Sequence, residues 1–278
     1  MAGSIRPVRV GFSLLLFVLS GTSPVEAAEL AEIQDRGYLI VGVKDNLRPL
    51  GFKNSQNQLQ GFEIDMAHQL AAELLGDDQA IELKPLLNQD RLNALLEGEV
   101  DVLIARMSIT DARTRLVAFS RPYYVDGAAF ITKDSAIQSL RDLQQRTIAV
   151  LTGSDTIPTI RSLLPSVRLR GVETYSEAQQ LLESGQVAVF AADATVLTGW
   201  VQESPQYHLI PTLISAEALA IAMPKGVQYD ELRQAVNQAV ERWQTNGWLR
   251  QQISTWGLLA EGFPSFTEST LDSPATVE

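Results

Sequence analysis

The chain has 278 residues, of which 45% are hydrophobic and 20% are charged, and its formal net charge is -11. The ordinary apolar fraction excludes a chain that is disordered throughout, and the length suggests two lobes or one large domain. The acidic balance argues against nucleic acid or anionic lipid as a partner, because both require a basic surface. With no Cys and only two His, disulfides, thiolate catalysis, Cys-ligated zinc and a His-pair metal site are excluded.

The first 28 residues have the order of a secretory signal peptide. Arg6 and Arg9 precede a short apolar run, and small residues surround a cleavage point after Ala27 or Ala28. A transmembrane anchor is the alternative, but the run is only half of the roughly 20 apolar residues needed to cross a bilayer. We therefore expect residues 1–28 to be removed on export to a bacterial periplasm, with no lipid anchor because no Cys follows the run.

The rest of the chain alternates short apolar runs with helical patterns. Strands are expected at 38–43, 80–83, 102–105, 128–132, 147–151, 187–191 and 219–223. Helices are expected at 61–75, 89–97, 137–144, 156–164, 175–184, 194–202 and 229–243. The alternation predicts βαβ units and a mainly parallel sheet, which gives the fold class α/β. Residues 261–278 lack periodicity and are expected to form a disordered tail.

Sequence motifs typical of enzymes are absent. The chain has no dinucleotide fingerprint, no P-loop, no HExxH zinc motif and no GxSxG nucleophile elbow. Glu63 and Asp65 form the carboxylate pair closest to acid/base spacing, but they stand near a helix start, where a charge interaction or a turn bond is the simpler interpretation. Neither His68 nor His208 is assigned a role. The sequence therefore predicts a protein that is not an enzyme and needs no cofactor or metal.

Polar residues come directly after several of the predicted strands. In open α/β sheets, ligands bind outside the carboxyl ends of the strands. Ser108 and Arg113 come after the strand at 102–105, and their hydroxyl and guanidinium groups can bind a carboxylate. Asp193 comes after the strand at 187–191 and can accept hydrogen bonds from an ammonium group. Such a pair complements a zwitterion, although a surface role for Arg113 and a helix cap for Asp193 are alternatives.

Three segments resemble the family 3 bacterial solute-binding proteins, which serve polar amino-acid ABC transporters. They are Met107–Tyr124 (MSITDARTRLVAFSRPYY), 61–67 (GFEIDMA) and 95–101 (LLEGEVD), and the resemblance extends over 30–258. It implies a two-lobed periplasmic binding protein (type II-like), with two crossing strands between lobes that close on a ligand. The implied lobes are residues 29–129 with 224–260 for lobe 1, and residues 130–223 for lobe 2.

The resemblance also assigns roles to individual residues at matching positions. It implies that Arg113, with the main-chain N–H of Ser108, holds the α-carboxylate of the ligand. It implies that Asp193 holds the α-ammonium group. Ser154 and Asp155 are then expected to line the cleft from lobe 2.

Selectivity for the ligand side chain is less firmly implied, because three positions depart from the family pattern. Leu47 stands where an aromatic residue is common, Arg106 where a small residue is common, and Asp155 where Thr is common. Lys44 and Arg48 also come after the first strand, and cations at the cleft rim favour an acidic or polar amino acid. Asp155 favours a cationic ligand instead, and salt-bridged rim charges are the alternative for all the cations.

The implied function is the capture of an amino acid for an ABC importer. The expected partners are the amino acid and the permease subunits of the transporter, with no nucleic acid, and the chain is expected to be a monomer. Exported cyclohexadienyl or arogenate dehydratases share the fold and are the alternative. That reaction needs a general acid over a ring substrate, and no His or isolated Glu stands at a predicted strand exit to supply it.

Overall fold

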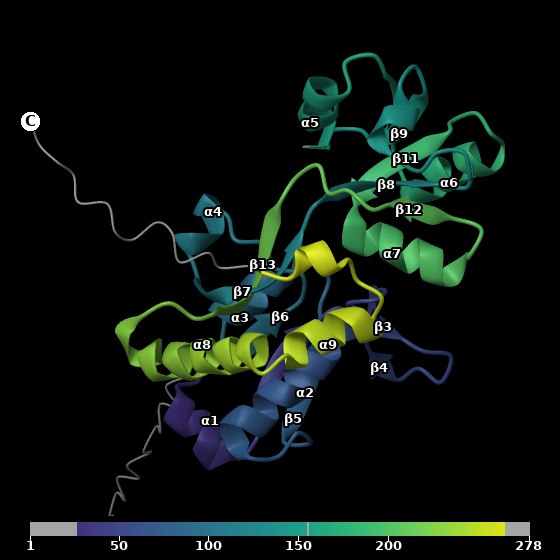
Figure 1. Ribbon diagram of the computed structural model, residues 1–278. Helices are drawn as coiled ribbons and strands as arrows, with labels where there is room; N and C mark the ends of the chain where they lie inside the picture. The colour runs from purple at the N-terminus through teal and green to yellow at the C-terminus, as the bar shows by residue number, and fades with distance from the viewer. Residues whose placement is uncertain (1–26, 155, 265–278) are drawn as a thin grey trace, which may run out of the picture.

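The computed structural model describes residues 27–154 and 156–264. These residues form two lobes, each built on a five-stranded sheet (Figure 1). The sheet of lobe 1 has the order β5 (Ile81–Pro85), β1 (Leu39–Val43), β6 (Val102–Ile104), β13 (Glu217–Met223) and β7 (Ala118–Asp126). The sheet of lobe 2 has the order β10 (Arg168–Val172), β9 (Thr147–Leu151), β11 (Val189–Asp193), β8 (Ala128–Thr132) and β12 (His208–Ile210). A small sheet of β2 (Asn46–Leu47), β3 (Gly51–Lys53) and β4 (Leu59–Gln60) comes after β1 in the chain.

Lobe 1 buries both faces of its sheet. Successive side chains of a strand point to opposite faces, so Val102 and Ile104 join one apolar cluster and Leu103 joins another. The first cluster is covered by α1 (Leu30–Arg36), α2 (Phe62–Leu75), α8 (Asp230–Thr245) and α9 (Trp248–Thr255). The second is covered by α3 (Arg91–Leu96), and the short helices α4 (Asp111–Thr114), η2 (Val227–Tyr229) and η3 (Ala260–Gly262) complete the lobe.

Lobe 2 is built in the same way, with one apolar cluster on each face of its sheet. Phe190 of β11 packs with α6 (Tyr175–Glu183) and α7 (Ala194–Glu203). Its neighbours Val189 and Ala191 face α5 (Thr156–Leu163) and the 3-10 turn η1 (Leu140–Leu143). Because both lobes are layered in this way, the carboxyl ends of β1, β6 and β11 are left free to carry polar side chains.

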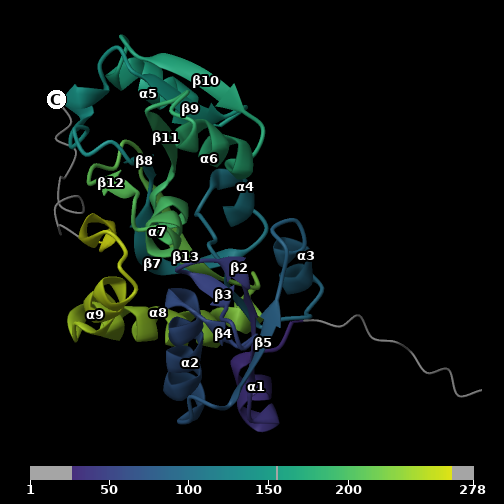
Figure 2. The same ribbon diagram turned by 90° about the vertical axis from the view of Figure 1, so that its right-hand side faces the viewer.

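Two segments of chain cross between the lobes, as the family resemblance implies. The chain leaves lobe 1 from Asp126 through Gly127 into β8, and it returns through residues 211–216 into β13 (Figure 2). The two crossings contact each other, since the main-chain N–H of Ala128 donates to Ser215 Oγ at 2.8 Å. A Cβ on Gly127 would lie 2.0 Å from the carbonyl oxygen of Ser215, so only glycine allows this approach.

The crossings also explain why the prediction of mainly parallel sheets is wrong. In each sheet two strand pairs are parallel and two are antiparallel. A chain that leaves a sheet at the end of a strand and re-enters beside that strand at the same end runs antiparallel to it, as β13 does beside β7. Residues 217–223, which the implied lobe boundaries put in lobe 2, therefore pair within the sheet of lobe 1.

The helices with strong periodicity agree with the sequence prediction. The helix expected at 61–75 is α2. The helix expected at 229–243 is α8, and its apolar stripe is buried. The segment 137–144, expected as a helix, forms only the 3-10 turn η1. The sequence does not predict β7, because Arg121 and Pro122 interrupt the pattern; the ladder with β13 is irregular at that point.

Both predicted terminal segments lie mostly outside the described residues. Of the predicted signal peptide only Ala27 and Ala28 are described. Of the predicted tail only residues 261–264 are described, and Gly262 in η3 is buried against the ring of Tyr124. In the described part of the chain no helix is both long and apolar enough to cross a membrane.

Candidate ligand-binding site

A cavity of about 670 Å³ lies between the lobes, at the carboxyl ends of β1, β6 and β11. This volume lies within the range of about 300–1,000 Å³ that is usual for small-molecule sites. The charged residues that line it from lobe 1 are Lys44, Arg48, Arg91 and Arg106. Those from lobe 2 are Asp193 and Glu203, accompanied by the rings of Tyr175 and Trp200.

The cavity brings together four of the eight predicted site residues, which are Lys44, Leu47, Arg106 and Asp193. Ser108 and Arg113 do not line it. They bind each other instead, since Arg113 Nη1 donates to the Ser108 carbonyl at 2.9 Å and to its Oγ at 2.6 Å. Ser154 also lies outside the lining, and its Oγ accepts from the main-chain N–H of Thr156 at 3.2 Å. Asp155 lies outside the described residues.

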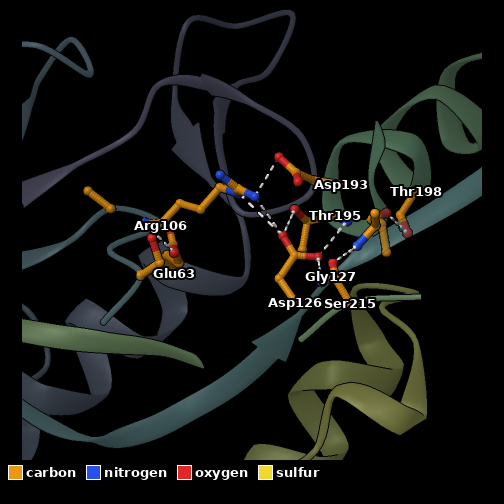
Figure 3. Close-up of polar contacts among 12 residues, drawn as sticks. Glu63, Arg106, Asp126, Gly127, Asp193, Thr195, Thr198 and Ser215 are labelled. Atoms are coloured by element: carbon orange, nitrogen blue, oxygen red, sulfur yellow. Dashed lines mark hydrogen bonds and ion pairs between the residues drawn. The ribbon is translucent and has the colours of Figure 1, made fainter. Parts of the chain in front are cut away.

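Arg106 links lobe 1 to the crossing strand and to lobe 2 (Figure 3). Its Nη2 lies 3.0 Å from Oδ2 of Asp126, at the end of β7, and 2.6 Å from Oδ2 of Asp193, at the end of β11. Burial alone would lower the pKa of Arg106, but the two carboxylates outweigh it and hold the pKa above its ordinary value. The residue is therefore a permanent cation that touches both lobes.

Asp126 is fully buried, and several donors satisfy it besides Arg106. It accepts from the main-chain N–H of Gly127 at 2.9 Å, from Thr195 Oγ1 at 2.6 Å and from the main-chain N–H of Thr195 at 3.2 Å. Thr195 lies in the first turn of α7. The carboxylate therefore fixes the start of α7 to the crossing strand.

Asp193 is more exposed than Asp126, and its side chain retains 29% of its accessible surface. Its ion pair with Arg106 uses Oδ2. Burial raises the pKa of Asp193 to about 6, although Arg106 acts in the opposite direction. The carboxyl group can thus accept from a ligand donor in the cavity while Arg106 holds it in place.

The main chain of Arg106 is held from behind by Glu63. Its φ of 51° lies in the left-handed region, and its N–H donates to Glu63 Oε1 at 2.7 Å. Glu63 is fully buried at the start of α2 and also accepts from Tyr123 Oη at 2.6 Å. Burial raises the pKa of Glu63. These bonds of Glu63 go to residues distant in sequence, and not to a local turn as the sequence suggested, and they fix the exit of β6.

Two further cations of lobe 1 line the cavity. Arg91 gives no signal in the sequence, yet it is 8% exposed and its guanidinium binds main-chain carbonyl groups. Arg48 sits 3.7 Å from the ring centroid of Phe52 and 3.5 Å from Glu203 of lobe 2. The carbonyl oxygen of Arg48 lies so close to Gly199 of α7 that a Cβ on Gly199 would be 2.4 Å from it. The two lobes are thus in direct contact beside the cavity.

Comparison with known proteins identifies the family. The family model of the bacterial extracellular solute-binding proteins, family 3, matches residues 39–258. The chain belongs to this family. The match covers all strands of both sheets and the residues that line the cavity.

Named relatives of this family 3 chain are transport proteins. A glutamine-binding protein of Geobacillus stearothermophilus is 37% identical over 199 residues, covering 70% of this chain and 76% of the relative. The ABC transporter glutamine-binding protein GlnH of Bacillus subtilis is 30% identical, covering 82% of this chain and 84% of the relative.

A solved structure supports the two-lobed fold of this family 3 chain. An ancestral cationic amino-acid solute-binding protein superposes with a TM-score of 0.68 at 30% identity, covering 82% of this chain and 98% of the other. A second structure of that ancestral protein describes it as a precursor of cyclohexadienyl dehydratase.

Proposed function

We propose that the protein captures an amino acid between its lobes and delivers it to the permease of an ABC importer. One observation carries the proposal: Asp193 of lobe 2 and the cationic residues of lobe 1 line one cavity of suitable size. A carboxylate on one wall and guanidinium or ammonium groups on the other complement a zwitterion. Membership of the family and the amino-acid-binding relatives support the same interpretation.

In this proposal Asp193 accepts from the α-ammonium group. Arg113 and the main-chain N–H of Ser108, which lie outside the lining of the cavity in this arrangement, hold the α-carboxylate when the lobes close on the ligand. Arg113 makes no ion pair among the described residues, so no carboxylate there neutralises its charge. The bonds from Arg113 Nη1 to Ser108 keep the guanidinium beside this N–H. The excess of cations over carboxylates in the lining favours an acidic or polar side chain.

The cellular setting is part of the proposal. We infer that residues 1–28 direct export and that the mature chain works as a monomer in the periplasm, where it meets the permease. The family is extracellular by description, which supports this setting.

A dehydratase of the same fold is the competing function, and the ancestral precursor gives it some support. The proposal nevertheless assigns no catalysis to this chain. Asp193 has a raised pKa and lines the cavity, but its ion pair with Arg106 favours the ionised form, which accepts rather than donates a proton. Incubation with prephenate and with arogenate tests this directly, and turnover of either would overturn the assignment.

The test of binding is a screen of the L-amino acids by thermal shift, and then calorimetry of the hits. At least one acidic or amide amino acid is expected to bind. Arg113→Ala is expected to weaken that binding by about 2–5 kcal/mol, because the ligand carboxylate loses its charged partner in a desolvated site. The free energy of unfolding should change little. If no amino acid binds, or if Arg113→Ala binds like the parent, the proposed role is wrong.

A further inference from the structure

The cations around the cavity fall into two groups. Arg106 and Arg48 are each paired with a carboxylate of lobe 2, Asp193 and Glu203 respectively. Lys44 and Arg91 also line the cavity but take part in no ion pair among the described residues. Two unpaired cations on one wall are unusual in a chain with a net charge of -11. Because buried charges are normally paired, a ligand anion is the expected partner.

Lys44 stands directly after β1 and is only 4% exposed. An ammonium group has three N–H donors, and the hydrogen bond that Lys44 Nζ makes within the described chain goes to the Leu86 carbonyl at 3.1 Å. Burial lowers the pKa of Lys44, and the nearby charge of Arg91 lowers it further. The ammonium group is therefore under-bonded within the described chain, in a buried residue that lines the cavity.

Arg91 is anchored by main-chain oxygen atoms alone. Its Nε donates to the Asn88 carbonyl at 3.3 Å, and its Nη1 donates to the carbonyl groups of Ala105 and Arg106. The hydrogen bonds of the described chain leave Nη2 free for a ligand. Lys44 thus binds the carbonyl of Leu86 and Arg91 binds the carbonyl of Asn88, so one short segment, residues 86–88, holds both cations.

We propose that Lys44 and Arg91 form a subsite for a second carboxylate, that of the ligand side chain. The proposal rests on the amino-acid-binding function proposed above and makes the ligand an acidic amino acid. The α-carboxylate engages Arg113 and the α-ammonium engages Asp193, so a side-chain carboxylate is the remaining ligand group that Lys44 and Arg91 can neutralise. A guanidinium can bind it with two N–H groups, and the ammonium adds a further charge-assisted bond.

The charges that line the cavity support an anionic ligand. The lining has four cations, Lys44, Arg48, Arg91 and Arg106, and two carboxylates, Asp193 and Glu203, which pair with Arg106 and Arg48. Asp45 and Glu63 act on Lys44 from outside the lining but form no ion pair with Lys44 or Arg91. A side-chain carboxylate of the ligand would give Lys44 and Arg91 a partner, whereas an amide or a cationic side chain would not.

The experiment compares pairs of ligands that differ only in charge. Calorimetry with L-glutamate against L-glutamine, and L-aspartate against L-asparagine, should show that the acid binds at least about tenfold more tightly than its amide. Lys44→Met removes the charge but keeps the length of the side chain. It should lower the affinity for the acid by about tenfold or more and leave the affinity for the amide within about threefold.

Controls separate this subsite from folding and from the general function. Lys84→Met removes an exposed cation of β5 that is paired with Glu99, and it should not change either affinity. Thermal unfolding establishes that Lys44→Met is folded, and Arg91→Lys provides a second variant that keeps the charge while losing the planar fork. Arg91→Lys should retain part of the preference for the acid.

Each outcome has a definite meaning. If L-glutamine binds as tightly as L-glutamate, or if Lys44→Met keeps the preference for the acid, the subsite is wrong while amino-acid binding stands. If no amino acid binds, but glutarate or succinate binds in a manner that needs Lys44, the anion subsite stands and the amino-acid function is wrong. If neither class binds, both proposals fail.

Discussion

For Arg106 the sequence leaves two interpretations open, a cation beside the ligand side chain or a salt-bridged rim charge, and in the structure two carboxylates of the protein pair with its guanidinium. Arg106→Met should therefore act first on stability, because it leaves the buried Asp126 without its cation. We expect the free energy of unfolding to fall by about 3 kcal/mol, the lower end for breaking a buried ion pair, since Asp126 keeps three other hydrogen bonds. Denaturant unfolding measures this.

The control for this prediction is Arg121→Met, which breaks an exposed pair with Glu241 at 3.8 Å and should change stability by less than about 1 kcal/mol. Adding Asp126→Asn to Arg106→Met should recover part of the loss, because the neutral amide no longer needs a cation. A double variant as unstable as the sum of the two single variants would contradict the assignment of Arg106 as the partner of Asp126.

Asp193 predicts how ligand affinity depends on pH. Burial raises the pKa of Asp193 to about 6, and an ammonium ligand needs the ionised form. The affinity should be constant above pH 7 and should fall by up to about tenfold per unit below pH 6. Asp193→Asn should bind more weakly, with a flat profile. Calorimetry between pH 5 and pH 8 tests this, and a parent affinity that does not change over that range would contradict it.

The same pKa has the opposite effect on folding. The carboxyl of Asp193 binds its proton more tightly in the folded than in the unfolded chain, whose ordinary pKa is 3.8. Its contribution to stability is therefore present below that value and is lost as the pH rises through about 6. Relative to Asp193→Asn, the parent should lose stability over the range in which it gains ligand affinity.

At the scale of elements, the sequence predicts those helices and strands that periodicity alone defines and misses those that depend on partners. The helix α8 is predictable because Leu232, Val236 and Ala239 recur with its turn, and all three are buried. The strand β7 is not, because Pro122 can be accommodated only by the irregular ladder with β13. In that irregular stretch Ser120 Oγ accepts from the main-chain N–H of Ile221, a contact that no local pattern indicates.

The residues of the candidate site also divide into those that the sequence predicts and those that it misses. Lys44, Arg106 and Asp193 could be named because strand ends are where open sheets bind ligands. Arg91 could not, because its inward orientation depends on the carbonyl groups of Ala105 and Arg106, which are distant in sequence. Family resemblance supplies Arg113, which the structure places outside the lining and bound to Ser108.

On the scale of the whole molecule, the closeness of the lobes depends on a glycine in the middle of α7. Gly199 lies against the carbonyl oxygen of Arg48 from lobe 1, and the Arg48–Glu203 and Arg106–Asp193 pairs lie in the same interface. Glycine in a helix interior costs about 1 kcal/mol relative to alanine. Gly199 is therefore expected to allow the two lobes to come close together, while it lowers the helix propensity of α7.

Gly199→Ala should separate closure from stability. The new Cβ would lie 2.4 Å from the Arg48 oxygen, a main-chain atom that cannot rotate away, so the closed arrangement should lose about 1–3 kcal/mol. Ligand affinity should fall by about tenfold, since closure brings the two halves of the site together. The radius of gyration of the ligand-saturated variant, measured by small-angle scattering, should exceed that of the parent. The melting temperature should not fall, because α7 gains helix propensity.

The control is Ser162→Ala, on the exposed face of α5. It raises the helix propensity of a lobe 2 helix without touching lobe 1, so it should leave the ligand affinity and the radius of gyration unchanged. A Gly199→Ala protein that binds and compacts like the parent would show that the contact between Gly199 and Arg48 has no part in closure.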